Sequence, residues 1–405
     1  MKTLYNLPKK VIFCKKCVTS NQRPNSYPEF NHTRERRNAK YLYIDKYGVC
    51  DACRVSEIKK KIDWKKRYKE FVRLLDKHRS NNKRYDCIVP GSGGKDSVYA
   101  SYILKYEYGM NPLTITWPPI LYTSYGYNNF LNWIKFGKFK NISFKHNKRV
   151  MKLLTKLSIE NLLHPFQTFI LGQKNFAPTI AKRFNIPLIF YGENEAEYGN
   201  PKKDILVSKR EQNFFSVKNY DKIFLSGISI NNLKENYNLS INDLRPFLPI
   251  LDHDLRDKKI EVHYLGYYLK WIPQEAYYYA VEKTNFKPRP FRTEGTYSKY
   301  NSIDDKIDDL HYYTTYIKYG IGRATHDASQ EIRNNHITRD EGKNLVKKFD
   351  GEFPKKYFNE VLEYLKIKPT KFIKLCDQFR SPHIWKKTKK GFILRHTINK
   401  DGADD

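Results

Sequence analysis

The segment that most constrains this chain runs from residue 87 to residue 104, where an apolar run leads into a glycine-rich turn. Cys87, Ile88 and Val89 have the character of a buried strand, and apolar residues recur at helical spacing from Val98 to Leu104. The turn between them is Pro90-Gly91-Ser92-Gly93-Gly94-Lys95-Asp96-Ser97. A strand, a glycine-rich turn and a helix present backbone N–H groups to an anion, so this segment predicts a phosphate-binding loop.

The turn differs from the two commonest phosphate-binding patterns. A Walker A loop has four residues between its glycines and a Ser or Thr after Gly-Lys, whereas Asp96 follows Lys95 here. The dinucleotide pattern GxGxxG would need a glycine where Asp96 stands. The turn instead resembles Ser-Gly-Gly-x-Asp-Ser, the loop of the PP-loop ATP pyrophosphatases, which split ATP into AMP and pyrophosphate. A plain serine–glycine turn capped by Asp96 is the alternative, and the strand–turn–helix setting favours the PP-loop.

The composition of the 405-residue chain indicates a folded and strongly basic protein. Its 75 Lys and Arg residues outnumber 43 Asp and Glu residues, which leaves a net charge of +32. Aromatic residues make up 15% of the chain, and disordered chains contain few of them. Such a charge suits a protein that binds RNA, a phosphorylated metabolite or an acidic partner. The alternative is that the charge reflects compositional drift and gives the chain only a general affinity for anions.

The cysteines indicate a metal site in a reducing compartment. The chain has no apolar run long enough to span a membrane and no apolar signal core at its start, so we expect a cytoplasmic protein without disulfides. Four of its six cysteines form the pairs Cys14-Lys15-Lys16-Cys17 and Cys50-Asp51-Ala52-Cys53. This spacing predicts a structural zinc (Zn²⁺) site with four thiolates, and an iron–sulfur cluster is the alternative. Cys87 and Cys376 are interpreted as buried apolar residues.

Strand and helix patterns alternate from residue 85 onward. The expected strands are Ile88–Val89, Leu113–Trp117, Ile142–Phe144, Leu188–Tyr191 and Glu261–Leu269. The expected helices between them are Val98–Tyr106, Val150–Leu163 and Asn175–Phe184. This alternation predicts an α/β fold with a doubly wound parallel sheet, whose ligands bind at the carboxyl ends of the strands. Gly91–Ser97 and Gly192–Asn194 would both lie at that edge.

The pattern divides the chain into four parts. We expect a zinc-knuckle unit with the start of a linker helix over residues 1–60, the PP-loop α/β domain over 61–287, a mainly helical region over 288–390, and a weakly ordered tail over 391–405. The polar segment from 198 to 249 is interpreted as an insertion or a lid. The expected C-terminal helices are Ile303–Tyr319, Asp327–Arg333, Arg339–Phe349 and Lys355–Leu365.

Further motifs are shared with one PP-loop family. They are Cys14-x-x-Cys17, Gly48-Val49-Cys50-x-x-Cys53, Tyr191-Gly192-Glu193-Asn194-Glu195-Ala196-Glu197-Tyr198-Gly199, Glu294-Gly295-Thr296-Tyr297, Ser302-Ile303-Asp304-Asp305-Lys306, Gly320-Ile321-Gly322-Arg323-Ala324-Thr325 and Asp350-Gly351-Glu352. Together with the PP-loop they resemble the N-acetyl sugar amidotransferases of bacterial surface-sugar pathways, which include pseudaminic- and legionaminic-type branches and O-antigen acetamidino sugars. The resemblance extends from about Cys14 to Leu365.

This resemblance implies an AMP-forming amidotransferase. The acetamido oxygen of an N-acetyl sugar, nucleotide-linked or nonulosonic, attacks the α-phosphorus of ATP, and ammonia then displaces AMP to leave an acetamidino group. The enzyme must neutralise the departing pyrophosphate, which positioned amides, Lys95 and magnesium (Mg²⁺) can do. The implied cofactors are therefore ATP, Mg²⁺ and Zn²⁺.

The resemblance also implies site residues. The expected ATP-binding residues are Gly91, Ser92, Gly93, Gly94, Lys95, Asp96, Ser97 and Gly192. The expected catalytic residues are Lys95, Asp96, Glu193, Asn194 and Arg323, with Asp96 also a ligand of Mg²⁺. The alternatives are helix capping by Asp96, a solvent-facing Lys95, a capped turn at Glu193 and an ordinary helix start at Arg323. His311, His326 and His336 are interpreted as surface or packing residues.

The expected nitrogen donor is ammonia from a separate glutaminase subunit, with a cyclase-like channel protein as a further candidate partner. Cys376 lacks the motif of a glutaminase nucleophile, and the paired cysteines are assigned to metal. A PP-loop tRNA-modifying enzyme is the alternative function, because zinc knuckles and basic charge suit it. A zinc-knuckle nucleic-acid binder without activity is a third interpretation, and the full Ser-Gly-Gly-Lys-Asp-Ser match disfavours it.

Overall fold

The centre of the molecule is a five-stranded sheet in which every pair of neighbouring strands is parallel. The computed structural model describes residues 1–36, 39–80, 82, 84–193, 195–255 and 259–399. The strands are β1 (Cys87–Pro90), β2 (Pro112–Thr116), β3 (Asn141–Ser143), β4 (Leu188–Tyr191) and β9 (Glu261–Tyr264), in the order β3-β2-β1-β4-β9. The α/β fold with a parallel central sheet that the sequence predicted is confirmed.

Both faces of the sheet are buried, because successive strand residues point to opposite sides. Cys87 and Val89 pack in one core with Phe71, which belongs to helix α2 (Trp64–His78). Ile88, between them, packs in another core with Leu154 of helix α5 (Lys148–Leu162). The continuous apolar run that leads into the glycine loop is thus a strand covered on two sides.

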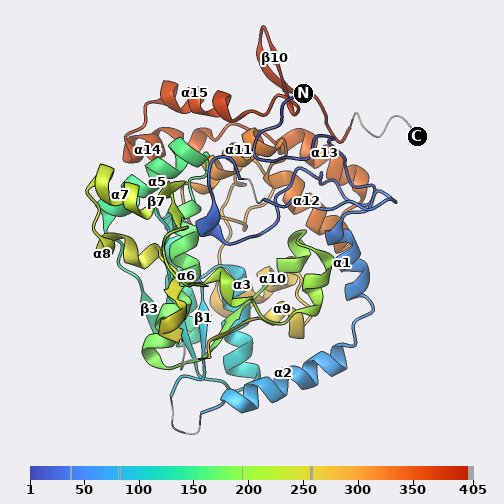
Figure 1. Ribbon diagram of the computed structural model, residues 1–405. Coiled ribbons are helices and arrows are strands. Elements are labelled where there is room, and N and C mark those ends of the chain that lie inside the picture. The colour runs from blue at the N-terminus through green and yellow to red at the C-terminus, as the bar shows by residue number, and fades with distance from the viewer. Residues whose placement is uncertain (37–38, 81, 83, 194, 256–258, 400–405) are drawn as a thin grey trace.

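Helices cover both faces of this sheet (Figure 1). The helices between residues 51 and 184 are α1 (Asp51–Lys59), α2 (Trp64–His78), α3 (Lys95–Tyr102), α4 (Ser124–Gly137), α5 (Lys148–Leu162) and α6 (Gln167–Phe184). A π-helical turn, η2 (Ile103–Glu107), continues α3. Helix α10 (Pro273–Thr284) packs against α3 and α4, where Val98, Trp133 and Ala280 share a core. None of the described helices is long and apolar enough to span a membrane.

The strand order reverses beside the glycine loop. The chain runs from β1 outward through β2 to β3, and then returns to β4 and β9 on the other side of β1. Such a switch point opens a crevice outside the carboxyl ends of the two central strands. The loops after β1 and β4 therefore flank one crevice.

The segment between β4 and β9 is a packed insertion rather than a lid. Its elements are η3 (Glu195–Tyr198), η4 (Lys202–Leu206), η5 (Gln212–Phe214), β5 (Ser216–Val217), β6 (Phe224–Leu225), β7 (Ile228–Ser229), α7 (Ile230–Tyr237), α8 (Ile241–Leu244), η6 (Arg245–Phe247), β8 (Ile250–Leu251) and η7 (Asp252–Leu255). Phe215, Leu233 and Phe247 belong to the same core as Ile88. The backbone N–H of Arg210 donates to Val262 O at 2.8 Å, so the insertion also covers the edge strand β9.

The N-terminal segment packs against the C-terminal helices (Figure 1). The elements here are η1 (Glu29–Asn31), α11 (Asp308–Tyr319), α12 (Arg323–Arg333), α13 (Arg339–Phe349), α14 (Lys355–Leu365), α15 (Pro369–Phe379), β10 (Trp385–Thr388) and β11 (Gly391–Leu394). Leu4 N donates to Ser381 Oγ at 2.9 Å, and Tyr5 OH donates to Phe379 O at 3.1 Å.

Several elements differ from the sequence prediction. Helices α4, α10 and α15 were not predicted, and the strand expected through Leu269 ends at Tyr264, where the short helix α9 (Leu265–Tyr268) begins. Helix α11 begins five residues later than expected and α12 begins four residues earlier, at Arg323. Residues 391–394, which the sequence placed in a weakly ordered tail, pair with β10. Buried Trp385 holds this hairpin, because its indole N–H donates to Ile317 O at 2.8 Å.

Candidate active site

The glycine loop after β1 is shaped by close backbone approaches. Gly93 has a φ of +86°, and a Cβ there would lie 2.6 Å from Phe130 Cα in α4. A Cβ on Gly192 would lie 2.7 Å from the carbonyl oxygen of Asp96, so the loops after β1 and β4 touch only because this residue is glycine. Helix α3 begins at Lys95, and the first N–H groups of a helix have no partner within it. The loop therefore directs several backbone donors toward the crevice.

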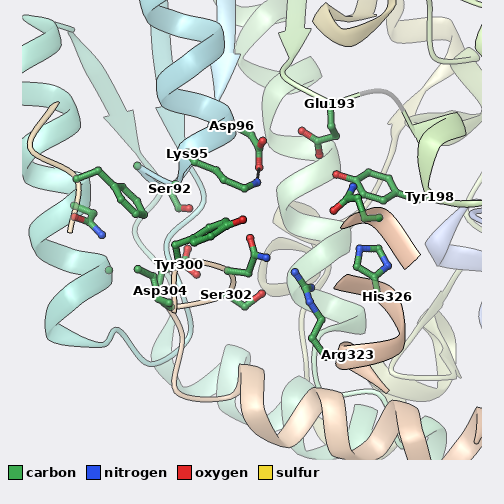
Figure 2. Close-up of a pocket in the computed structure, with 18 residues that line it drawn as sticks. Ser92, Lys95, Asp96, Glu193, Tyr198, Tyr300, Ser302, Asp304, Arg323 and His326 are labelled. Atoms are coloured by element: carbon green, nitrogen blue, oxygen red, sulfur yellow. Dashed lines mark hydrogen bonds and ion pairs between the residues drawn. The ribbon is translucent and has the colours of Figure 1, made fainter. Parts of the chain in front are cut away.

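The crevice contains a cavity of about 370 Å³ in which most of the predicted site residues meet. The predicted residues that line it are Ser92, Gly93, Gly94, Lys95, Asp96, Glu193 and Arg323 (Figure 2). Three predicted residues do not belong to the described lining, namely Gly91, Ser97 and Gly192. They lie behind the loop and support it, as Ser97 does by donating from Oγ to Gly94 O at 2.9 Å. Asn194, predicted to be catalytic, lies outside the described residues.

Lys95 and Asp96 form one unit at the start of α3. Lys95 Nζ lies 2.5 Å from Asp96 Oδ2, and the lysine side chain is only 10% exposed. Trp271 donates its indole N–H to the other carboxylate oxygen of Asp96 at 3.0 Å. The solvent-facing alternative for Lys95 is thus wrong, and two side-chain donors orient the carboxylate of Asp96.

The opposite wall is formed by Glu193, Tyr198 and His326 (Figure 2). Tyr198 and His326 stack with their ring centroids 5.4 Å apart. Burial, together with Glu193 and Asp96, raises the pKa of the Tyr198 hydroxyl well above its usual value. Burial and the nearby Arg323 guanidinium hold the pKa of His326 well below its usual value, so its imidazole is neutral at physiological pH. His326 thus packs against Tyr198, as the sequence interpretation allows, and it also lines the cavity.

Arg323 is held at the first position of α12 by neighbouring side chains. Its Nε donates to Asp327 Oδ1 at 2.8 Å, and its Nη1 donates to the hydroxyl of Tyr312 at 3.1 Å. Asp350 accepts bonds from the N–H of Gly322 at 2.9 Å and of Thr325 at 3.1 Å, and so fixes the start of the helix. Asp327 and Thr325 therefore position the helix and its arginine, while Arg323 itself faces the cavity.

The donor set in the cavity suits a magnesium–nucleotide pair. Asp96, Glu193 and Asp304 contribute carboxylates, and carboxylate oxygens are ligands that Mg²⁺ prefers. Among the described residues, no three acidic, histidine or cysteine side chains of this cavity come close enough to enclose an ion by themselves. Mg²⁺ is normally held by one or two carboxylates together with substrate phosphates, and this arrangement fits that pattern.

Sequence reasoning missed part of the lining. Tyr198, Ser302 and Asp304 belong to the shared motifs quoted above, but nothing in their local pattern marked them as site residues. Trp271 lies between β9 and α10 without any motif. These side chains reach the loop after β1 only through the folding of distant segments.

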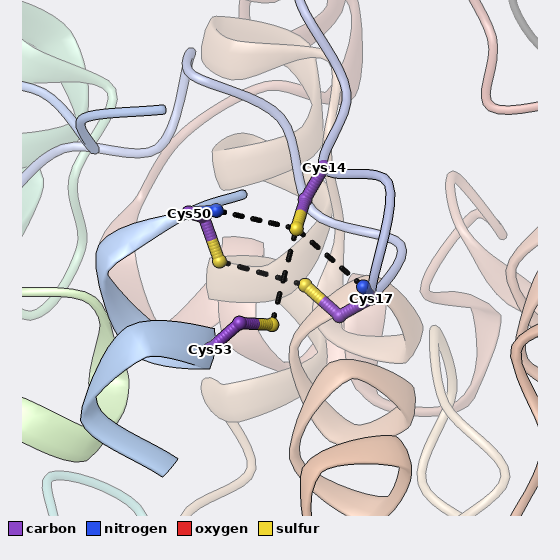
Figure 3. A group of neighbouring side chains, drawn as sticks. All are labelled: Cys14, Cys17, Cys50 and Cys53. Carbon is purple, nitrogen blue, oxygen red and sulfur yellow. Dashed lines mark hydrogen bonds between the residues drawn. The ribbon is translucent and has the colours of Figure 1, made fainter. Parts of the chain in front are cut away.

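The four paired cysteines form a closed cluster (Figure 3) and do not line this cavity. Cys14 Sγ lies 3.8 Å from Cys53 Sγ, and Cys17 Sγ lies 3.7 Å from Cys50 Sγ. Sulfurs that bind one tetrahedral zinc ion at ~2.3 Å lie roughly 3.8 Å apart, so the spacing fits a single ion. The Sγ of Cys14 also accepts N–H bonds from Lys16, Cys17 and Cys50 at 3.3–3.5 Å, which favour a thiolate.

Helix α1 connects the cysteine cluster to the cavity. Cys50 precedes this helix and Cys53 lies in its first turn, while Lys59 is its last residue. Lys59 Nζ donates to Glu197 Oε1 at 2.7 Å and to Trp271 O at 2.5 Å. Glu197 precedes Tyr198 in the cavity wall, and Trp271 holds Asp96. The cluster therefore supports two elements of the candidate active site from behind.

Comparisons with known proteins agree with the C-terminal motifs. A family model described as "LPS biosynthesis protein WbpG-like, C-terminal domain" matches residues 294–398. This match confirms the predicted resemblance, since the C-terminal region is similar to that of WbpG-like lipopolysaccharide biosynthesis proteins. No curated protein matches the chain.

Two solved structures, both of synthetases, match part of this chain. The NH3-dependent NAD synthetase of Campylobacter jejuni, solved with a nitrate ion, has 17% identity and a TM-score of 0.27, over 45% of this chain and 77% of its own. The NMN synthetase of Francisella tularensis has 14% identity and a TM-score of 0.26, over 48% of this chain and 81% of its own.

Proposed function

We propose that this protein is an ATP-dependent amidotransferase that converts the acetamido group of an N-acetyl sugar into an acetamidino group, with release of AMP and pyrophosphate. The observation that carries the proposal is the meeting of a Ser-Gly-Gly-Lys-Asp-Ser loop with Arg323 of a WbpG-like segment across one cavity. The sugar would serve a surface polysaccharide or glycan. The reaction belongs to the cytoplasm, where ATP is supplied and the cysteines stay reduced.

In the first step the acetamido oxygen attacks the α-phosphorus of ATP, and the bond to pyrophosphate breaks. The backbone N–H groups of residues 92–95 and the Lys95 ammonium hold the negative charge that develops on the leaving pyrophosphate. Asp96 and Glu193 would hold Mg²⁺, which neutralises phosphate charge when bound. Arg323 faces the same space from α12 and can contact either the phosphate or the sugar.

In the second step ammonia attacks the imidate carbon, a proton leaves the nitrogen, and AMP departs with the former amide oxygen. His326 supplies the only imidazole of the described lining, and its neutral form can accept that proton. Adenylation is needed because an amide oxygen is a poor leaving group by itself.

A separate glutaminase subunit, with or without a cyclase-like channel protein, is the proposed ammonia source. All six cysteines are buried, and burial raises the pKa of the Cys376 thiol to about 12. A nucleophilic cysteine needs an accessible site that favours the thiolate. We further propose that the four-cysteine cluster binds one structural Zn²⁺, because its sulfurs face one another and leave no open position.

The decisive experiment measures nucleotide products with ATP, Mg²⁺, ammonium chloride and a panel of N-acetyl sugars. AMP and pyrophosphate should form only when a suitable sugar is present. ADP as the product would exclude the assignment. Stimulation of AMP release by unmodified tRNA, and by none of the sugars, would support the tRNA-modifying alternative.

A further inference from the structure

A second polar cavity of about 460 Å³ lies between the N-terminal segment 23–36, the end of α5, α6 and α11. Tyr27, His32 and Arg36 reach it from the N-terminal segment, and His311 and Lys318 reach it from α11. The cysteine motifs and the glycine loop contribute nothing to its lining.

Buried polar atoms without a hydrogen-bond partner gather in this cavity. They are Arg23 Nη1, Tyr27 OH, His32 Nε2, Arg36 Nε, His164 Nδ1 and His311 Nδ1. His32 and Arg36 are each only 6% exposed, so bulk water does not satisfy them. Buried donors and acceptors of a folded protein almost always have partners, and a group of them without any indicates a site for a bound molecule.

Basic side chains dominate the charged lining of this cavity. Arg23, Arg36, Lys174 and Lys318 line it, and Glu29 is the only acidic residue of its described lining. The carboxylate of Glu29 is already engaged by His32 and by His164 Nε2, the latter at 3.2 Å. Within the described chain, neither Arg36 nor Lys318 has a carboxylate at ion-pair distance, although both are buried. Buried cations without a counter-charge are costly, so this cavity favours an anion.

Two short connections join this cavity to the candidate active site. A Cβ on Gly199, next to Tyr198 of the active-site wall, would lie 2.8 Å from Arg23 Nη1 of the second cavity. Arg323 bonds the hydroxyl of Tyr312, whose neighbour His311 lines the second cavity. Gly199 and Tyr312, which line neither cavity, thus connect the wall of one to the wall of the other.

The size of the active-site cavity is a second, independent reason to expect a further binding site for the substrate. Its volume of about 370 Å³ lies near the lower end of the roughly 300–1,000 Å³ typical for one drug-sized ligand. The proposed reaction requires ATP and a sugar at the same time. A second polar cavity close by can therefore hold a part of the sugar that extends beyond the first one.

We propose that the second cavity binds the anionic part of the sugar substrate, a carboxylate or a phosphate, with Arg23, Arg36 and Lys318 as its charge partners. This inference rests on the proposed function, since the anionic sugar is its substrate. Charge-assisted bonds from arginine and lysine suit both anions. The cavity would thereby select acidic or phosphorylated N-acetyl sugars over neutral ones.

A metal ion is the competing occupant, because ligand atoms of Glu29, His32 and His164 lie within 4.8 Å of one another. The four basic side chains around them disfavour a divalent cation. Metal binding in this cavity is therefore one outcome of the test and not the proposal itself.

The test is calorimetric titration of the full chain with three probes. N-acetylneuraminic acid carries a carboxylate, N-acetylglucosamine 1-phosphate carries a phosphate, and N-acetylglucosamine is neutral. We expect at least one anionic probe to bind about tenfold or more tightly than the neutral one. Comparison of the two anionic probes distinguishes carboxylate from phosphate. Equal binding of all three would overturn the proposal.

Two variants with a matched control link this preference to the cavity. Lys318→Met and Arg36→Met should each abolish the preference for the anionic probe, whereas Lys77→Met, at a lysine 64% exposed on α2, should keep it. The melting temperature of ligand-free Lys318→Met should stay close to that of the wild type, because relief of a buried charge offsets loss of the bond from Lys318 Nζ to Leu162 O at 2.7 Å. Retained preference in both cavity variants would overturn the proposal.

Metal analysis and product analysis complete the test. Binding of a second Zn²⁺ equivalent that His164→Ala abolishes would assign the cavity to a metal and overturn the anion site. If the anionic probe binds as expected and no AMP forms with any sugar, the proposed reaction fails while the anion site stands. AMP formation with neutral sugars alone, without an anion preference, would overturn the second site and leave the proposed reaction intact.

Discussion

The four-cysteine cluster and the cavity of the candidate active site differ in whether their functional atoms face one another or open space. The sulfurs of the cluster face each other, and its cysteines are between 0% and 4% exposed. Side chains of the cavity such as Asp96 and Arg323 are held by a neighbour on one side and face open space on the other. The first arrangement stabilises a fold, whereas the second leaves groups available for chemistry.

The two regions are nevertheless connected, so the comparison can be tested by substitution. Helix α1 begins at the cluster and ends at Lys59, which contacts the two elements behind Tyr198 and Asp96. If the cluster is purely structural, its loss should affect the whole molecule. Changes at the cavity should affect activity alone, and changes at Lys59 should affect both.

The largest effect is expected from Cys14→Ser. Structural zinc sites contribute free energy comparable to the total stability of a domain, roughly 10–16 kcal/mol in small zinc peptides, so this variant should lose its zinc and unfold or aggregate. Elemental analysis of the wild-type protein should find about one zinc per chain. Cys87→Ser, at a cysteine outside the cluster, should keep the zinc. An iron–sulfur absorption band, or a zinc-free wild type, would contradict the prediction.

The next effect is loss of catalysis without loss of the fold. Asp96→Asn should reduce AMP formation by roughly 10²–10³-fold, the size expected when one group that stabilises transition-state charge is removed. Its melting temperature should stay close to that of the wild type. Glu282→Gln is the matched control, since Glu282 is 70% exposed and pairs only with Lys283 among the contacts described. Unchanged AMP formation in Asp96→Asn would remove this residue from the active site.

The effect of Lys59→Met on stability and on activity should lie between those of Cys14→Ser and Asp96→Asn. The substitution leaves Glu197 buried without its cation, and breaking a buried ion pair costs about 3–5 kcal/mol. We expect a lower midpoint in urea unfolding together with weaker AMP formation, because Trp271 loses a contact as well. The double variant Lys59→Met with Glu197→Leu should recover stability more than activity. Full activity in the single variant would show that α1 does not position the cavity.

The smallest effect is expected at Cys376. This thiol is 1% exposed and burial raises its pKa to about 12, so it should not act as a nucleophile. The wild-type protein alone should use ammonium salts and not glutamine, and Cys376→Ser should behave the same with a loss of stability of at most about 1–2 kcal/mol. Efficient use of glutamine by the pure chain would contradict the separate ammonia source.

The sequence alone determined the elements whose signal is local. The apolar run, the glycines and the helical periodicity around residues 87–104 specify strand, turn and helix by short-range sterics and backbone bonding. The paired cysteines likewise predicted a cluster, because two cysteines separated by two residues can reach the same metal ion. The parallel α/β class followed from alternating strands and helices, and the structure confirms it.

Only the tertiary structure decided which distant side chains complete the sites. Trp271 and His326 face the loop after β1 because β9 and α12 pack near the switch point, and no local pattern records that proximity. The hairpin β10–β11 forms because Trp385 is buried against α11, which the lysine-rich strand sequence does not reveal. The second cavity collects cations from segments almost three hundred residues apart. Local propensity depends on neighbours in the chain, whereas burial and charge depend on neighbours in space.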